Sequence, residues 1–393
     1  MLTSDDLPGT GVFIDNKYAD PADGGTLTDV NPATEQPIAQ IAAGGPADID
    51  RAVRSARSAL DGPWGSTPGT ERARLLNRVA DLLERDRDVL VRLEVADVGK
   101  TLHHARLVDV PNAVATFRHF AGWADKITGT VIPTAGHMGH RTLSYTVREP
   151  VGVIGAIVPW NTPLMIAAWK LAPALAAGNT VVVKPPEDAP LSILHLAALL
   201  AEAGFPEGTV NVVPGLGPTA GQALVEHPDV DKISFTGSPE VGRRIQVTAG
   251  QSFKRVTLEL GGKSPHIVLP DADLDAAVAG VALGLFSNQG EVCAAGTRIL
   301  VHRSRYQDLT EALAEAARAQ VVGDPFDEAT TLGALINPAQ RDRVLGYIER
   351  GRAEGARVVA GGGSPDRPGY FVEPTIFADV DNAMVIAQEE IFG

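Results

Sequence analysis

The sequence predicts an α/β fold built around a doubly wound parallel sheet, and two observations lead to this prediction. From position 151 onward, short runs of β-branched residues alternate with longer helical runs. The strand candidates are VGVIGAIVP, TVVVKP, TVNVVPG, DKISFTG and RVTLELGG, and the first of them is apolar throughout, which is typical of a strand buried on both faces. Because right-handed crossover helices join parallel strands, helices are expected on both faces of this sheet.

The other elements follow from hydrophobic spacing and from helix stop signals. Between the strands we expect helices at 164–177, 191–203, 219–226 and 240–247, and before the strands at 47–60 and 71–98. A second α/β segment begins after Gly262, with strands at HIVLP and TRILVH and helices at 274–286 and 306–319. Residues 127–149 contain two alternating runs around a Gly-rich turn, which predicts a protruding β-hairpin with contacts between subunits.

Composition and charge argue against several classes of function. The formal charge is −14 and the sequence pI is about 5.1, so nucleic acid and anionic membrane surfaces would be repelled and are not expected as partners. Cys293 is the only cysteine, which leaves no internal disulfide and no CxxC metal site. The first ten residues include Asp5 and Asp6 and lack an apolar run, so we expect a cytoplasmic protein without a signal peptide.

An uncharged stretch at 151–169 is long enough to cross a bilayer, and Lys170 is the only charge between it and Lys184. Pro159 and Pro163 interrupt this stretch, and its character changes from Val/Ile to Ala/Leu between them. A buried strand, a turn and a helix therefore explain it better than a membrane span.

Cys293 lies in FSNQGEVCAAGTR, on a Gly-flanked connection between an expected helix and an expected strand. That placement favours access to the thiol and a nucleophilic role, although a lone cysteine is more often an inert small residue of a core. Glu291 stands two residues earlier and would disfavour the thiolate if both side chains shared one face of an extended segment.

Two further side chains are candidates for catalysis. Glu259 in LELGGKSP ends an apolar strand, where burial would raise its pKa and suit it to act as a general base. The alternative is an ion pair with a nearby cation such as Lys263. Asn161 in PWNTP stands between a strand and a helix, where its amide could donate to an oxyanion or cap the helix.

Three segments are candidates for binding a nucleotide. KPPE ends a buried strand, so Lys184 and Glu187 could contact a ribose, although solvated charges on a loop are the commoner case. FTGSPEVG places Gly237 and Ser238 between a strand and a helix N-terminus, which suits a pyrophosphate. GLGPTAG at 215–221 is a weak dinucleotide signal because its third glycine comes one position late.

The sequence lacks the motifs of several other enzyme classes. GKT at 99–101 and GKS at 262–264 have no upstream glycine as a P-loop requires, and neither GxSxG nor HExxH occurs. No cluster of metal ligands is recognisable, so no metal is expected.

The amino-acid sequences of these motifs and their order along the chain resemble those of the NAD(P)-dependent aldehyde dehydrogenase superfamily. The matching segments, from FIDNKY at 13–18 to the last residue, include PWNTP, KPPEDAP, FTGSPEVG, LELGGKSP, NQGEVCAAGTR and EEIFG. The resemblance implies an aldehyde dehydrogenase-like fold with a doubly wound Rossmann-type cofactor domain and an α/β catalytic domain. The implied boundaries are 1–126 and 150–261 for the NAD-binding domain, 127–149 for an oligomerisation hairpin and 262–393 for the catalytic domain.

The resemblance also implies roles for individual residues. Cys293 matches the nucleophile, Glu259 the general base, and Asn161 the oxyanion donor beside the backbone N–H of Cys293. The expected NAD contacts are Lys184 and Glu187 on the adenosine ribose, Gly237 and Ser238 at the pyrophosphate, Trp160, Glu390 and Phe392 toward the nicotinamide end, and Gln340.

The implied reaction is oxidation of an aldehyde to a carboxylic acid through a cysteine thioester, which water activated by Glu259 hydrolyses. Two rivals remain at this point: a coenzyme A-acylating semialdehyde dehydrogenase, and a nucleotide-binding module without turnover. The segment NQGEVCAAGTR is similar in sequence to that of bacterial enzymes that act on aromatic and medium-chain aldehydes. The sequence does not specify which aldehyde is the substrate.

Three departures from the family pattern accompany the resemblance. Thr162 stands where an aromatic residue is frequent, which predicts a wider substrate pocket. Glu291 replaces a residue that is commonly Gln. Relatives continue beyond EEIFG with more of the catalytic domain and an oligomerisation strand, so we expect a homodimer or homotetramer at full length and little or no activity from residues 1–393 alone.

Overall fold

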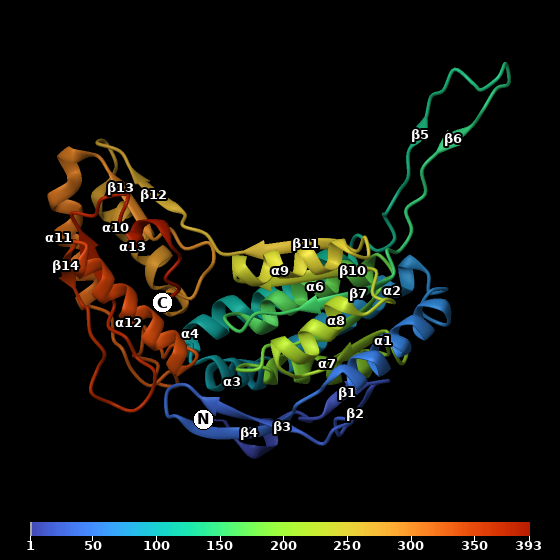
Figure 1. Ribbon diagram of the computed structural model, residues 1–393, viewed down its shortest axis with the longest axis horizontal. Coiled ribbons are helices and arrows are strands. Elements are labelled where there is room, and N and C mark those ends of the chain that lie inside the picture. The colour runs from blue at the N-terminus through green and yellow to red at the C-terminus, as the bar shows by residue number, and fades with distance from the viewer. Residues whose placement is uncertain (1) are drawn as a thin grey trace.

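The computed structural model describes residues 2–393 and is built around a seven-stranded sheet (Figure 1). Its strand order is β11–β10–β7–β8–β9–β1–β2. The first five of these are parallel, which confirms the predicted doubly wound series: β11 (Arg255–Leu260), β10 (Lys232–Gly237), β7 (Val153–Ile157), β8 (Thr180–Lys184) and β9 (Val210–Val212). The strand-like FIDNKY segment is a tight antiparallel hairpin at the sheet's other edge, formed by β1 (Val12–Ile14) and β2 (Lys17–Ala19).

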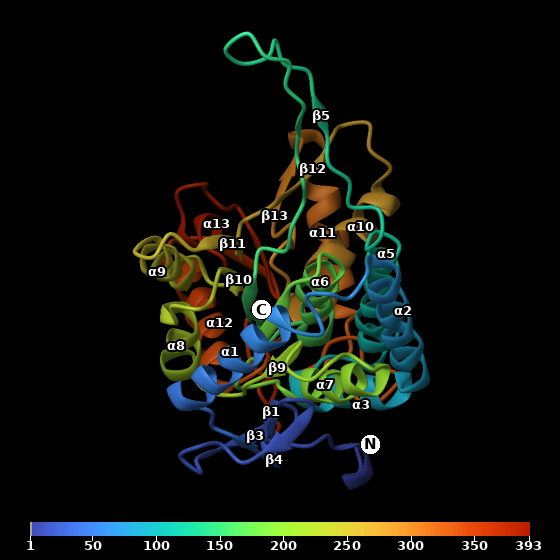
Figure 2. The ribbon, with the colours of Figure 1, turned by 90° about the vertical axis from the view of Figure 1, so that its right-hand side faces the viewer.

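Helices cover both faces of this sheet (Figure 2). One face carries α2 (Gly69–Arg85), α3 (Arg87–Val98), α5 (Val110–Ala121), α6 (Pro163–Ala176) and α7 (Leu191–Ala203). The other face carries α1 (Pro46–Asp61), α8 (Gln222–Glu226) and α9 (Pro239–Gly250). Short elements between them are a 3-10 turn (Ser4–Asp6), the hairpin β3 (Thr26–Asn31) and β4 (Gln36–Ala42), α4 (Leu102–His104) and two π-helical turns (Ala105–Asp109 and Gly217–Gly221).

Two of the predicted helices differ from the structure. The single helix expected at 71–98 is wrong, because the chain leaves helical geometry at Asp86 (φ −93°, ψ 16°) between α2 and α3. The Asp86 carboxylate accepts hydrogen bonds from Arg85 and pairs with His195 of α7 at 2.8 Å, and such tertiary partners compete with helix continuation. The helix expected at 219–226 begins instead as a π-helical turn and becomes α8 only at Gln222.

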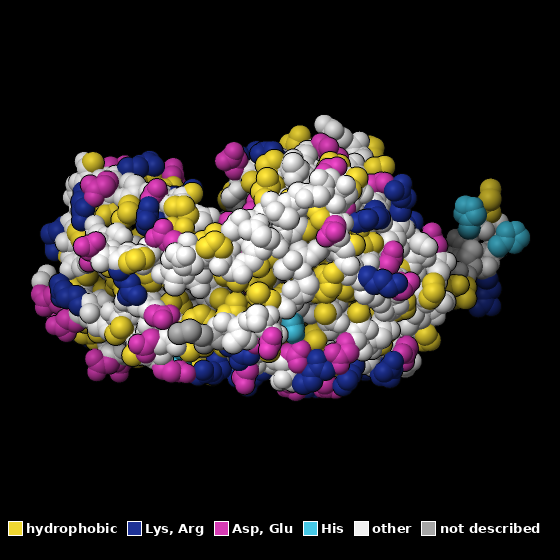
Figure 3. Space-filling view, turned by 90° about the horizontal axis from the view of Figure 1, so that it is seen from below, with side chains coloured by type: hydrophobic (Ala, Val, Ile, Leu, Met, Phe, Trp, Pro, Cys, Tyr) yellow, Lys and Arg dark blue, Asp and Glu magenta, His cyan; other side chains and the backbone are white. Residues whose placement is uncertain are grey.

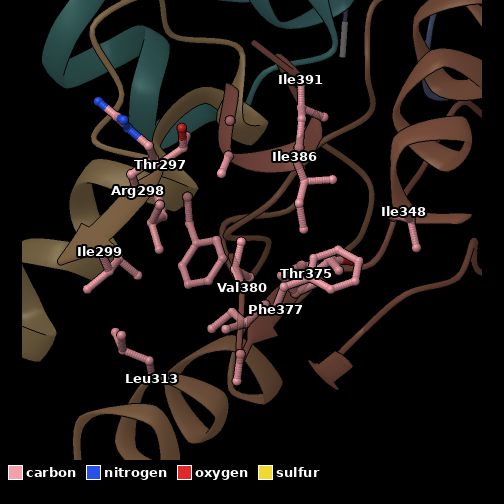
Figure 4. A pocket seen from close by; sticks show the side chains of 18 of the residues that line it. Thr297, Arg298, Ile299, Leu313, Ile348, Thr375, Phe377, Val380, Ile386 and Ile391 are labelled. Atoms are coloured by element: carbon pink, nitrogen blue, oxygen red, sulfur yellow. The ribbon is translucent and has the colours of Figure 1, made fainter. Parts of the chain in front are cut away.

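A second lobe follows the large sheet and holds two small sheets. β12 (Pro265–Val268) pairs in parallel with β13 (Arg298–Val301), and β14 (Arg357–Ala360) pairs antiparallel with β15 (Ile376–Ala378). The helices of this lobe are α10 (Leu274–Phe286), α11 (Tyr306–Arg318), α12 (Pro338–Ala353) and α13 (Val385–Gln388), with 3-10 turns at Ser287–Gly290 and Arg303–Arg305. An apolar groove of about 330 Å³ lies among them, and Figure 4 shows side chains such as Ile299, Phe377 and Ile391 around it.

The predicted hairpin projects from the end of the molecule opposite the second lobe (Figures 1 and 2). Its strands are only two residues long, β5 (Val131–Ile132) and β6 (Ser144–Tyr145), and they pair antiparallel. Apolar side chains along it are exposed, including Leu143 at 76% and Val147 at 67%. Figure 3 shows the hairpin reaching beyond the body, whose face in that view mixes acidic and basic side chains.

The uncharged stretch at 151–169 forms β7, a loop and the start of α6, as expected. In residues 2–393, none of the helices combines the length and the apolar character needed to cross a membrane.

A fully buried charge cluster lies beneath the loop that joins β7 to α6. Lys100 Nζ contacts Asp109 Oδ2 at 2.7 Å and Glu94 Oε2 at 3.0 Å, and all three side chains have no exposed surface. Glu94 Oε1 accepts hydrogen bonds from the backbone N–H of Leu164 at 3.1 Å and from the hydroxyl of Ser192 at 2.6 Å. One carboxylate therefore joins α3 to the first turns of α6 and α7.

We predict that Lys100→Met destabilises the fold strongly, because it leaves two carboxylates buried without their cation. Loss of one partner of a buried ion pair costs about 3–5 kcal/mol in the free energy of unfolding. Chemical denaturation followed by circular dichroism measures this value. The control is Lys17→Met, because Lys17 pairs with Glu207 at 3.4 Å on an exposed surface, where pairs contribute at most about 1 kcal/mol. Equal effects of the two changes would contradict the prediction.

Candidate active site

The site lies at the carboxyl ends of the parallel strands, where the strand order reverses at β7. β8 and β9 extend the sheet to one side of β7, and β10 and β11 extend it to the other. The loops after these strands open at one edge, which is where ligands of doubly wound sheets bind. The 287–297 loop of the second lobe reaches this edge, because the Asn161 amide donates to the Glu291 carbonyl oxygen at 2.8 Å. Asn161 is itself buried.

Cys293 lies in a turn of the 287–297 loop, and its side chain is exposed. Partial burial raises the pKa of its thiol, and the nearby charges of Glu390 and Glu259 raise it further. The backbone N–H groups of Cys293 and Ala294 donate toward the sulfur and lower the pKa. The thiol is thus accessible, and two carboxylates lie within electrostatic reach of it.

Glu291 does not share a face with Cys293. Its side chain is fully buried, and its Oε1 accepts a hydrogen bond from the backbone N–H of Ile336 at 3.2 Å. Burial raises the pKa of Glu291 well above its usual range. Glu291 itself has φ −82° and ψ 53°, so the segment is not extended there and positions 291 and 293 are not held on one face. The conflict that an extended segment would create is therefore absent at this position.

Glu259 lies near the end of β11 beside Thr236 of β10, and the expectation of a buried carboxylate is wrong because its side chain is exposed. β11 is the last strand of the sheet, so no strand covers its outer edge. The cation within electrostatic reach is Lys170 of α6: burial lowers the pKa of Lys170 to about 8, and the charge of Glu259 opposes that shift.

Lys263 lies near a different carboxylate from the one suggested by the sequence. Burial lowers the pKa of Lys263 to about 8, and the charge of Glu390 acts in the opposite direction. Burial also raises the pKa of Glu390, whose carboxylate accepts a hydrogen bond from the backbone N–H of Gly262. Glu390 therefore lies against the Gly261–Gly262 turn that follows β11, and it brings the end of the chain to the site.

Lys184 and Glu187 form an ion pair at the carboxyl end of β8. Although burial raises the pKa of Glu187, the Lys184 ammonium and backbone N–H groups lower it overall. One of these N–H donors is that of Gly217, at 3.4 Å from Glu187 Oε1. The pair therefore faces the π-helical turn that contains most of the weak GLGPTAG motif.

Ser238 is the N-cap of α9 and follows Gly237, the last residue of β10. Its hydroxyl accepts a hydrogen bond from the backbone N–H of Val241 at 3.3 Å, so the free N–H groups of the first turn and the hydroxyl lie together. Such a helix N-terminus favours an anion. A cleft of about 370 Å³ beside α8 and α9 is lined by Pro218, Gln222, Arg243, Arg244, Val247 and Thr248.

Trp160 and Phe392 meet edge to face, with ring centroids 5.2 Å apart and an interplanar angle of 81°. Gln340, near the start of α12, donates through Nε2 to the carbonyl oxygens of Phe392 and Ile391. The structure thus brings Trp160 and Phe392 together, and the Gln340 amide holds the backbone of the 391–392 segment.

The remaining predictions concern the substrate pocket and metals. Thr162 is buried, and its hydroxyl has no hydrogen-bond partner among the described residues, so a wider pocket stays a prediction. No cluster of three His, Cys, Asp or Glu side chains suited to a metal ion is found between residues 2 and 393.

Two residues of the site were missed by reasoning from the sequence. Lys170 had a visible signal, since it is the only charge between 151 and Lys184 in an otherwise apolar segment. Asn288 had none, because its contacts to Asn161 depend on how the two lobes meet.

Comparison with known proteins places the chain in a family. The model of the aldehyde dehydrogenase family matches residues 18–393. The chain is 50% identical over 385 residues to the mitochondrial aldehyde dehydrogenase of Homo sapiens, covering 97% of this chain and 74% of that protein. It is 49% identical to aldehyde dehydrogenase, cytosolic 1, of Mus musculus, covering 98% of this chain and 76% of that protein.

Solved structures agree with the sequence relatives. The NAD+ complex of the aldehyde dehydrogenase from Bacillus cereus superimposes with a TM-score of 0.97 at 45% identity, covering 100% of this chain and 80% of that chain. A structure from Burkholderia cenocepacia described as an aldehyde dehydrogenase has a TM-score of 0.95 at 46% identity, covering 98% of this chain and 79% of that chain.

We predict that Glu390→Gln lowers the pKa of the Cys293 thiol, because it removes a negative charge that disfavours the thiolate. Alkylation by iodoacetamide at neutral pH should therefore accelerate severalfold, and its pH profile should move to lower pH. Glu389→Gln is the matched control, since Glu389 is exposed and accepts from the hydroxyl of Tyr347 at 2.7 Å. An unchanged profile for Glu390→Gln would place this carboxylate out of reach of the thiol.

Proposed function

The chain belongs to the aldehyde dehydrogenase family and oxidises an aldehyde with NAD, and we propose that the oxidation proceeds through a thioester on Cys293. The observation that carries this proposal is the meeting of the Cys293 loop with Asn161 at the carboxyl edge of the large sheet. An exposed thiol, two carboxylates and a buried amide converge there from both lobes.

The first step is attack of the Cys293 sulfur on the aldehyde carbon, which moves negative charge onto the aldehyde oxygen. The Asn161 amide carries two N–H groups, and the Glu291 carbonyl oxygen uses one of them. The second N–H and the backbone N–H of Cys293 are the proposed donors to this oxyanion. The chemistry that NAD would supply when bound is acceptance of a hydride, and loss of that hydride from the thiohemiacetal would give the thioester.

The second step is hydrolysis of the thioester, for which Glu259 removes a proton from water. Its exposure lets water reach the carboxylate, and its charge acts on both the Cys293 thiol and the Lys170 ammonium. A base beside the acyl group favours water over coenzyme A as the acceptor. This supports the hydrolytic reaction over the coenzyme A-acylating alternative, and release of free acid without coenzyme A distinguishes them.

The residues at the sheet edge fit NAD. The Glu187 carboxylate beside Lys184 suits the two hydroxyls of a ribose, and the N-terminus of α9 at Gly237 and Ser238 suits the pyrophosphate. The Trp160 and Phe392 rings and the Glu390 carboxylate offer an apolar wall and an acceptor at the nicotinamide end. We assign Gln340 the task of holding the Phe392 backbone there.

The organisation of the protein forms part of the proposal. We assign 1–126 and 150–261 to NAD binding, 262–393 to catalysis and 127–149 to contacts between subunits in a cytoplasmic dimer or tetramer. The exposed apolar side chains of the hairpin support the last assignment, since such residues are usually covered.

We predict that Glu259→Gln allows one equivalent of NADH to form and then stalls at the thioester. Hydride transfer needs only the thiohemiacetal, whereas removing a general base slows hydrolysis by about 10²–10⁴-fold. Rapid mixing of stoichiometric enzyme, NAD and aldehyde, followed by NADH absorbance, measures the burst, and intact mass spectrometry detects the acyl adduct.

Cys293→Ser is the control for that measurement, because it should give no burst while calorimetric NAD binding persists. Unimpaired steady turnover of Glu259→Gln would assign deacylation to another base, and a burst from Cys293→Ser would remove the thiol from the mechanism. A chain that binds NAD but forms neither NADH nor acyl adduct would favour the nucleotide-binding module.

We predict a preference for NAD over NADP that depends on Glu187, since its carboxylate would repel a 2′-phosphate. Lys184 lowers the pKa of Glu187, so the carboxylate is charged at neutral pH. Glu187→Ser should reduce the ratio of NAD to NADP affinity by about tenfold or more, equivalent to about 1.4 kcal/mol. Calorimetric titration measures both affinities, with Glu207→Ser as an exposed control. An unchanged ratio would assign the preference to other groups.

A further inference from the structure

Asn288 stands five residues before the nucleophile, in a turn with unusual backbone geometry. Asn288, Gln289 and Gly290 have consecutive positive φ angles of 48°, 55° and 81°. Asparagine tolerates this left-handed conformation better than most residues. The turn directs the Asn288 side chain into the protein, where only 3% of the residue is exposed.

The Asn288 amide bridges the two lobes. Its Nδ2 donates to the carbonyl oxygen of Asn161 at 3.1 Å and to that of Glu291 at 3.3 Å. The Asn161 amide donates in return to the same Glu291 oxygen at 2.8 Å. The buried Asn288 amide therefore holds two groups: the backbone carbonyl of Asn161, and the Glu291 carbonyl oxygen to which the Asn161 side chain donates.

We propose that Asn288 is a positioning residue that aims the Asn161 amide at the oxyanion. The two N–H groups of a planar amide lie at a fixed angle, so fixing the acceptor of one determines the direction of the other. Donors act on an oxyanion only over about 2.7–3.1 Å, and productive sites hold their groups within about 0.5 Å. This inference rests on the proposed function of Asn161 and adds Asn288 to it.

A merely structural role for Asn288 would have a different signature. If the amide only keeps the 287–297 loop folded, its loss displaces Cys293 and slows every reaction of the thiol. If it aims Asn161, its loss slows only reactions that pass through an oxyanion. Acylation of Cys293 by p-nitrophenyl acetate forms a tetrahedral oxyanion, whereas alkylation by iodoacetamide is a direct displacement at carbon and forms none. Neither reaction needs NAD or hydride transfer.

The experiment measures both rates on the unaltered chain, Asn288→Gly, Asn161→Ala and the double variant. Glycine keeps the left-handed backbone and removes the amide. Removal of an oxyanion donor costs about 10²–10³-fold, so Asn161→Ala should slow acylation by up to that factor and Asn288→Gly by about tenfold or more. Alkylation should change less than about twofold in Asn288→Gly, and Asn288→Gly should add little to Asn161→Ala, since coupled residues are not additive.

Asn288→Asp is the second variant, because it keeps the size and the backbone preference of Asn288, while a carboxyl group, even if burial keeps it protonated, has a single donor and cannot serve both carbonyl oxygens. It should reproduce the selective loss of acylation. Proportional losses of acylation and alkylation in both variants, or additive effects of Asn288→Gly and Asn161→Ala, would overturn the positioning role.

Failure of the proposed function looks different. If aldehyde-dependent NADH formation is absent but acylation depends jointly on Asn161 and Asn288, the dehydrogenase mechanism fails and the positioning role stands. If Asn161→Ala leaves acylation unchanged, Asn161 is no oxyanion donor and the positioning role falls with it.

Discussion

The loop that carries Asn161 rests on a buried carboxylate, and the geometry of the whole site depends on that support. Glu94 accepts from the N–H of Leu164 in the first turn of α6 and pairs with Lys100, which has no exposed surface. Burial alone would lower the pKa of Lys100, but Asp109 and Glu94 raise it overall, so the cluster retains its cation. α6 begins just after Asn161, and Glu94 of α3 binds both the first turn of α6 and Ser192 of α7. The position of the Asn161 amide therefore depends on α3 and on the start of α7.

The same support extends through the second lobe to the loop that carries Cys293. Asn161 donates to the Glu291 carbonyl, and the Glu291 carboxyl accepts from Ile336, so the 287–297 loop is held from both directions. The backbone N–H of Ala334 also donates to the carbonyl oxygen of Gly99 at 3.1 Å, next to Lys100. The two lobes are therefore joined beneath the site by buried hydrogen bonds, which are costly to break without water to replace them.

The sequence predicted the bounds of helices well where residues next to the helix determine where it begins or ends. The bounds of α7 and α10 match the expected 191–203 and 274–286, because Gly204 ends the first in left-handed geometry and Asp273 caps the second. The break at Asp86 depends on partners outside the helix, and the exposure of Glu259 depends on the place of β11 at the sheet edge. The residues of the motifs could be recognised from the amino-acid sequences of those motifs. Asn288 could not, because its contacts with Asn161 form only when the two lobes come together.

The proposed nucleophile, Cys293, lies within electrostatic reach of two carboxylates that raise the pKa of its thiol, and the proposed tasks of these carboxylates explain why they are there. In the proposed mechanism Glu259 acts after the thioester forms and Glu390 lies where the cofactor is expected, so each carboxylate has a task of its own beside its effect on the thiol. A thiolate of higher pKa is also a stronger nucleophile, which partly offsets its lower abundance. Lys170 lies near Glu259 and Lys263 near Glu390, each with a pKa of about 8. Below that pH both ammonium groups are charged and moderate the carboxylates. Above it they lose their protons, and the negative field on Cys293 grows as thiolate formation becomes easier, so the two effects oppose each other across the same pH range.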